Sequence, residues 1–144
     1  PSRSGRVNRV FMVVGCPSSG KTWVCDQLKD KFHCVRHDPL GKAEPYVAEI
    51  MQQSKSATMP LLIEAPFSIS EIKDPLERAG FQVTPVFIQE NPAVLGQRYW
   101  LREHRPIPRQ HLSRQNTYAQ RATAWGAFQG NSSQVLAHLR DMNK

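Results

Sequence analysis

The chain has 144 residues and a formal net charge of +7, which fits one basic domain because domains typically contain about 100–200 residues. This length excludes large motor ATPases and multidomain polymerases. Hydrophobic residues at 40% and charged residues at 22% are typical of a globular chain with one core, and they exclude a fibrous or wholly disordered protein.

No segment of the sequence predicts a membrane span or an export signal. The longest apolar runs, residues 10–14 and 61–63, are far shorter than the roughly 20 residues of a membrane-spanning helix. The basic segment 1–8 leads directly into a strand-like run without a signal-peptide cleavage site. The three cysteines match no zinc-binding spacing. We therefore expect a reduced, cytoplasmic protein with no membrane partner and no obligate protein partner.

Short apolar runs alternate with segments of helical spacing along the first two thirds of the chain. Four of the runs are predicted to be strands: residues 9–15, 33–37, 59–65 and 81–88. Three segments between them are predicted to be helices: residues 21–32, 44–54 and 69–80, the last after a capping box at 68–71. Beyond Pro92 the chain is predicted to be helical and arginine-rich to about residue 124, and a last helix covers 134–141.

This alternation predicts an α/β fold of three layers, with a mostly parallel sheet of four to five strands and helices on both faces. We expect one domain over residues 9–144, preceded by a flexible basic segment 1–8. Parallel sheets bind ligands beyond the carboxyl ends of their strands. The residues that end or follow the four strands are therefore expected to gather at one edge: Gly15, Asp38, Glu64 and Gln89.

Residues 15–22 match the phosphate-binding loop pattern G-x-x-x-x-G-K-[ST]. The loop consists of Gly15, Cys16, Pro17, Ser18, Ser19, Gly20, Lys21 and Thr22. Its two glycines let the backbone N–H groups wrap a phosphate, Lys21 is expected to hold the β- and γ-phosphates, and Thr22 is expected to ligate Mg²⁺. Trp23, the next residue, belongs to the same predicted nucleotide-binding set. The motif thus predicts a P-loop NTPase fold that binds ATP and Mg²⁺, the alternative being a plain glycine-rich turn.

Other residues favour a kinase among the proteins that share this loop. An N-K-x-D guanine motif is absent from the sequence. Asp38, after the second predicted strand, is a candidate base for the attacking hydroxyl, or else it caps the turn before Pro39. Glu64 is predicted to contact the substrate or the water shell of Mg²⁺, or else it is a solvated carboxylate at a strand end.

Positive charge is concentrated between residues 96 and 121, where six arginines accompany a single acidic residue, Glu103. Arg98, Arg102 and Arg105 recur at helical spacing until Pro106 and Pro108 stop the helix. We interpret residues 92–115 as an arginine-rich helical lid over the triphosphate, the alternative being a solvated basic face.

Four aromatic residues interleave with these arginines: Tyr99, Trp100, Tyr118 and Trp125. They can stack on bases, although aromatic residues at helical spacing more often belong to the core.

The loop at 15–22, the sequence Arg36-His37-Asp38 and the sequence Leu95-Gly96-Gln97-Arg98 together resemble a known group. The chain is similar to the kinase domain of phage-type polynucleotide kinases and to the wider P-loop group of nucleoside, nucleotide and zeta-toxin kinases. The resemblance covers residues 10–121, and its specific part is the phosphate loop.

The resemblance implies roles for several residues. The family's general base falls on Asp38, and its lid arginine falls on Arg98, with Arg102 or Arg105 as the alternative. An adenine contact falls around residues 130–133. Two positions depart from the polynucleotide kinases, which often have Gly in place of Ser18 and an Asp in the region of Glu64.

The expected function is transfer of the γ-phosphate of ATP to a hydroxyl of a polynucleotide 5′ end, or of a related nucleic-acid component. A nucleic acid or a nucleotide is the expected partner, because a net charge of +7 attracts a polyanion. The alternatives are a nucleoside or nucleoside monophosphate kinase, a kinase of a hydroxymethylated base in DNA, and a nucleotide-dependent binding module.

Overall fold

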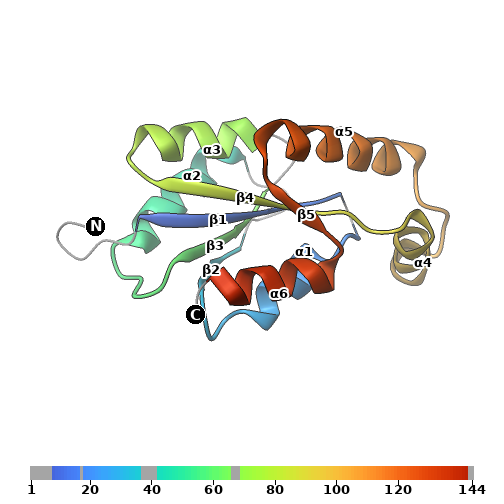
Figure 1. The fold of residues 1–144 in the computed structure, drawn as a ribbon, viewed down its shortest axis with the longest axis horizontal. Helices are drawn as coiled ribbons and strands as arrows, with labels where there is room; N and C mark the ends of the chain where they lie inside the picture. The colour runs from blue at the N-terminus through green and yellow to red at the C-terminus, as the bar shows by residue number, and fades with distance from the viewer. Residues whose placement is uncertain (1–7, 17, 37–41, 66–68, 143–144) are drawn as a thin grey trace.

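The computed structural model describes residues 8–16, 18–36, 42–65 and 69–142. Within these ranges strands and helices alternate along the chain (Figure 1). The strands are β1 (Arg9–Val14), β2 (His33–Val35), β3 (Leu61–Glu64), β4 (Gln82–Ile88) and β5 (Phe128–Gly130). The helices are α1 (Lys21–Gln27), α2 (Ala43–Ser54), α3 (Ile69–Arg78), α4 (Pro92–Glu103), α5 (Arg109–Trp125) and α6 (Ser132–Met142).

The strands form one parallel sheet in the order β2-β3-β1-β4-β5. β1 occupies the centre, where Val13 lies opposite Glu64 of β3 and Val14 lies opposite Phe87 of β4. Since every pairing is parallel, the carboxyl ends of all the strands lie at the same edge of the sheet. The predicted α/β fold with a parallel sheet is confirmed.

Strand β1 is buried on both faces, as its continuous apolar run predicts. Val10, Met12 and Val14 pack into one hydrophobic cluster, and Phe11 and Val13 pack into the other. Full burial of a side chain of this size contributes about 1.5–3 kcal/mol, which favours the central position for this strand.

Helices cover both faces of the sheet. The first cluster contains residues of α2, α3 and α5, and the second contains residues of α1 and α6. Figure 1 shows the same three layers, with α4 beyond the end of the sheet. Helix α4 is therefore placed to act at the carboxyl edge rather than to cover the core.

The predicted lid breaks where its prolines indicate. Helix α4 ends at Glu103, His104 adopts a left-handed φ of 59°, and α5 begins at Arg109. Arg105 therefore lies beyond the end of α4 and does not continue the helical face of Arg98.

Strand β5 lies in a segment that the sequence predicts as a turn. It contains three residues and pairs only with the last three residues of β4. A strand of three residues, which follows Gly126 and ends at Gly130, is too short to show an alternation of apolar and polar residues in the sequence. Helix α6 also begins earlier than predicted, at Ser132.

Parts of the sequence-based prediction fall outside the described residues. These are the basic segment 1–7, Pro17, Asp38 and Ser68 of the predicted capping box. Among the described helices none is long and apolar enough to cross a membrane.

Candidate active site

The phosphate loop connects β1 to α1 at the carboxyl edge of the sheet. The N–H of Ser19 donates to the carbonyl of Cys16 (3.1 Å), and the N–H of Val24 donates to the carbonyl of Gly20 (2.9 Å). Ser18 and Gly20 have left-handed φ angles of 70° and 105°. The left-handed φ of Ser18 is a conformation that Gly adopts at no steric cost, whereas a side chain there is strained.

Both glycines of the motif lie in crowded positions. A Cβ on Gly15 would lie 2.3 Å from Oγ of Ser19, and a Cβ on Gly20 would lie 3.2 Å from Cβ of Ser132. At Gly20 the positive φ adds a conformational reason. A side chain at Gly15 would therefore collide with Ser19, and one at Gly20 would crowd Ser132, so both positions favour glycine.

Lys21 is the first residue of α1, and its side chain folds back over the loop. Its Nζ donates to the carbonyl of Gly15 (2.5 Å). Burial lowers the pKa of Lys21, and the nearby Glu64 carboxylate acts in the opposite direction. A phosphate bound by the loop can therefore replace the carbonyl of Gly15 as the partner of the Lys21 ammonium group.

Thr22 and Glu64 meet across the sheet edge. Oγ1 of Thr22 donates to Oε1 of Glu64 over 3.1 Å, although the two residues are 42 positions apart. The contact follows from the topology, because β3, which ends at Glu64, is the direct neighbour of β1. The role of Glu64 toward the substrate or the water shell of Mg²⁺ stays a prediction, and its carboxylate lies against Thr22, the residue expected to ligate the ion.

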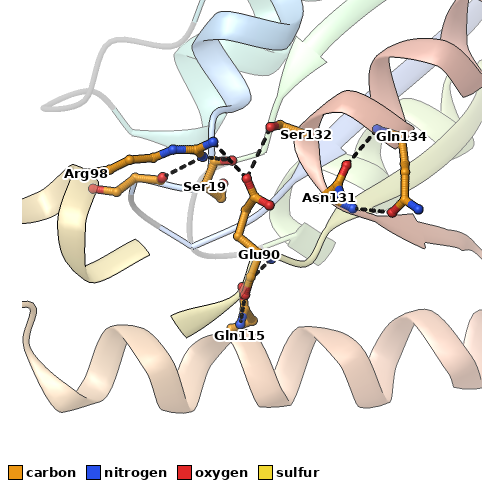
Figure 2. A network of polar contacts seen from close by, with 8 residues as sticks. Ser19, Glu90, Arg98, Gln115, Asn131, Ser132 and Gln134 are labelled. Atoms are coloured by element: carbon orange, nitrogen blue, oxygen red, sulfur yellow. Dashed lines mark hydrogen bonds and ion pairs between the residues drawn. The ribbon is translucent and has the colours of Figure 1, made fainter. Parts of the chain in front are cut away.

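Arg98 extends from α4 to the phosphate loop. Its Nη1 donates to the carbonyls of Ser18 (3.3 Å) and Ser19 (3.0 Å), and its Nη2 forms a 2.9 Å ion pair with Oε2 of Glu90. Figure 2 shows the guanidinium between the loop and Glu90. Of the lid arginines proposed from the sequence, Arg98 is therefore the one that the structure brings to the loop.

Glu90, two residues beyond the end of β4, links three helices. Its carboxylate accepts from Arg98 of α4 and from Oγ of Ser132, the first residue of α6 (3.2 Å). Its backbone N–H and carbonyl bond to Oε1 and Nε2 of Gln115 of α5 at 2.9 and 2.8 Å, as Figure 2 shows. The side chain of Glu90 is only 8% exposed, so this network holds α4 against the end of the sheet.

The sequence did not predict Glu90 or Gln115, and it marked Ser132 only within the range 130–133 of an implied adenine contact, not as a partner of Glu90. The available signal was the position of Glu90, one residue after Gln89 at the predicted end of the fourth strand. No local pattern marks Gln115 or Ser132.

The loop before α6 lies beside the phosphate loop, as the Gly20–Ser132 approach shows. Asn131 and Gln134 bond each other's backbone N–H groups, both at 2.8 Å, and so cap α6 (Figure 2). The segment 130–133, where the resemblance implies an adenine contact, therefore lies next to the phosphate loop.

The remaining predicted site residues have no contact with the phosphate loop within the described chain, are partly exposed, or are buried inside the loop. Arg102 and Arg105 lie near the ring of Tyr99, with their guanidinium carbons 5.5 and 5.9 Å from its centre, and no contact joins them to the loop among the described residues. Trp23 is 44% exposed. Cys16 is fully buried, and burial raises the pKa of its thiol.

Comparison with known proteins adds to this geometry. No family model and no curated protein sequence matches the chain. Among solved structures, a gluconokinase from Sinorhizobium meliloti 1021 is 20% identical, with a TM-score of 0.53 over 78% of this chain and 75% of that chain. The chain has a P-loop kinase-like fold.

Two further structures share this fold. A de novo designed P-loop fold protein is 13% identical, with a TM-score of 0.52 over 94% of this chain and 90% of that chain. The protein APE1195 is 9% identical, with a TM-score of 0.58 over 96% of this chain and 95% of that chain.

Proposed function

We propose that the protein transfers the γ-phosphate of ATP to a hydroxyl of a polynucleotide 5′ end. The observation that carries this proposal is the convergence of Lys21, the Thr22–Glu64 pair and Arg98 on one phosphate loop. Cationic clamps, a metal-binding hydroxyl and a lid arginine are the groups that phosphoryl transfer requires, because catalysis of this reaction consists of positioning and charge stabilisation.

Two buried hydroxyls support phosphate binding at the loop. Oγ of Ser18 and Oγ of Ser19 are buried without a hydrogen-bond partner among the described residues. Buried polar atoms are normally satisfied, and phosphate oxygens are acceptors for such hydroxyls. The loop in this structure therefore has unused donors in the segment that wraps the phosphates of ATP.

Thr22 and Glu64 fit a Mg²⁺ ion. Both offer oxygen atoms, which Mg²⁺ prefers, and Mg²⁺ is commonly held by one or two protein oxygens together with substrate phosphates. In the described part of the chain no cluster of three His, Cys, Asp or Glu residues forms an independent metal site. When bound, the ion neutralises charge on the β- and γ-phosphates.

In the proposed reaction the acceptor hydroxyl forms a new O–P bond while the bond from the γ-phosphorus to the ADP oxygen breaks. Asp38, assigned from its place after the second strand in the sequence, takes the hydroxyl proton. Lys21 holds the phosphates, and Arg98 neutralises charge that develops on the transferred group.

The variant Asp38→Asn tests this assignment. We expect it to bind ATP with the affinity of the parent and to lose transfer of labelled γ-phosphate to a 5′-hydroxyl oligonucleotide by about a hundredfold or more, the range of general base catalysis. Binding is measured with a fluorescent ATP analogue. Transfer at the parent rate would refute the role of Asp38.

A small hydroxyl compound is the second candidate acceptor, and the likeness in fold to a gluconokinase favours it. Salt dependence separates the two candidates, because each phosphate contact with a strand releases counterions. A polynucleotide kinase loses oligonucleotide affinity steeply as salt rises. A small-molecule kinase shows little change with its own acceptor.

A further inference from the structure

The lid carries a cluster of basic residues whose contacts, among the described residues, do not include the phosphate loop. At its centre is Tyr99, whose ring is buried. The guanidinium carbons of Arg102 and Arg105 lie 5.5 and 5.9 Å from the ring centre, and the His111 ring stands edge-on at 5.5 Å. The ring of Tyr99 thus lies close to Arg102 of α4, Arg105 of the turn after α4, and His111 of α5.

The positive charge of this cluster is largely unbalanced. Arg102 has one carboxylate partner, Glu103 beside it in sequence (3.1 Å, both side chains exposed). Among the described residues no carboxylate lies within ion-pair distance of Arg105 or of the exposed Arg109. An anion from another molecule can therefore bind Arg105 and Arg109 without displacing a carboxylate of the described chain.

His111 adds an unused polar atom to the same place. Its Nδ1 is buried without a hydrogen-bond partner in the described part of the protein. Its ring packs on Tyr99, within reach of the arginines.

The residue types indicate what kind of anion fits. Between positions 96 and 121 the sequence has six arginines and no lysine, and arginine binds phosphates with two parallel hydrogen bonds and stacks on flat groups. Next to Tyr99, Trp100 is 51% exposed. Exposed aromatic rings and phosphate-binding arginines are the side chains by which proteins hold single-stranded nucleic acids.

We propose that Trp100, Arg102, Arg105, Arg109 and His111, here called the lid surface, bind the backbone and a base of a single-stranded polynucleotide acceptor. This rests on the proposed function and extends it from the transferred group to the strand behind the 5′ end. The arginines bind internucleotide phosphates, the ring of His111 packs on Tyr99 beside them, and Trp100 stacks on a base.

The test compares two double variants that remove the same charge. Arg102→Ala with Arg105→Ala changes the lid surface. Arg78→Ala with Arg121→Ala changes α3 and the far end of α5. Affinity for a 3′-labelled, 5′-hydroxyl single strand is measured by fluorescence anisotropy across a salt series, and affinity for an ATP analogue is measured in parallel.

We expect the lid-surface variant to lower strand affinity and to reduce the slope of log K against log salt by about 0.7 for each strand phosphate that is no longer neutralised. The control variant should keep the parent slope, and both should bind ATP normally. Equal effects of the two variants, or an equal loss of ATP affinity in the lid-surface variant, would overturn the proposal.

A second variant, Trp100→Ala, tests the stacking interaction independently of charge. We expect about a tenfold loss of strand affinity with an unchanged salt slope and unchanged ATP binding. Parent-level affinity would overturn the role of Trp100. If instead the parent itself neither binds nor phosphorylates the strand, it is the proposed function that fails.

Discussion

The ion pair between Arg98 and Glu90 allows a quantitative test of how the lid is held. We consider Arg98→Ala, Glu90→Gln and the double variant. The two charges lie 2.9 Å apart, with side-chain exposures of 39% for Arg98 and 8% for Glu90. Because the carboxylate is buried and the guanidinium is partly hydrated, removing the two partners should not cost the same.

Arg98→Ala should lower the free energy of unfolding by about 2 kcal/mol, because it leaves a buried carboxylate with Ser132 as its side-chain partner. Glu90→Gln should cost about 1 kcal/mol, since Arg98 keeps the carbonyls of Ser18 and Ser19 and access to water. In the double variant, the side chain at position 90 is a neutral amide and loses less stability without Arg98 than the Glu90 carboxylate does. We therefore expect the double variant to be about 1 kcal/mol more stable than the sum of the two single effects, which is the coupling energy.

Urea unfolding followed by circular dichroism measures each variant, and the four free energies close a double-mutant cycle. Independent sites are additive within about 0.3–0.5 kcal/mol. A coupling energy inside that range would refute the account of Glu90 as the residue that positions Arg98. Transfer rates add a second readout, since Glu90→Gln should slow phosphate transfer while leaving ATP affinity near that of the parent.

Three further predictions concern the surroundings of the site. Gln115→Ala should lower the free energy of unfolding by about 2–3 kcal/mol in urea titration, because the buried N–H and carbonyl of Glu90 lose their partner; a decrease below about 0.5 kcal/mol would contradict this. Gly20→Ala should weaken binding of a fluorescent ATP analogue, since the φ of 105° and the 3.2 Å approach to Ser132 exclude a side chain; normal binding would be evidence against the loop geometry. Burial, and then nearby arginines, lower the pKa of His111, so a bound strand should raise that pKa and bind more tightly as pH falls through it; an NMR titration that finds one pKa with and without oligonucleotide would show that no phosphate approaches.

The parts of the fold that the sequence predicted depend on local pattern. Strand β1 is a continuous apolar run that ends at the glycine of the phosphate loop, and both its burial and its central place follow from that run. The contact of Glu64 with Thr22 was not predicted, because it also needs β3 rather than β2 to lie beside β1.

What the sequence did not predict depends on distant pairs. Arg98 meets Ser18 across 80 positions, and Glu90 meets Gln115 and Ser132 across 25 and 42. No periodicity marks such pairs, because their partners are chosen by the packing of α4, α5 and α6 around the end of β4. The contact of His111 with Tyr99 was missed for the same reason, since it requires the turn after α4 to bring α5 back toward α4.

The aromatic residues show why burial had to be seen in the structure. Tyr99 and Tyr118 are 4% and 5% exposed and belong to the interior, as the more common interpretation of such spacing predicted. Trp100 and Trp125 are 51% and 43% exposed. Adjacent positions on a helix differ in this way because the helix rotates by about 100° for each residue, and the sequence alone does not show which side faces the protein.

The most direct test of the central claim offers several acceptors to the protein in one mixture with Mg²⁺ and γ-labelled ATP. The mixture contains a 5′-hydroxyl oligonucleotide, the same oligonucleotide already phosphorylated at its 5′ end, nucleosides, nucleoside monophosphates and gluconate. We predict that label appears on the 5′-hydroxyl oligonucleotide alone and that the Asp38→Asn variant abolishes it. Label on a small acceptor alone would contradict the polynucleotide assignment, and label on no acceptor would contradict phosphate transfer itself.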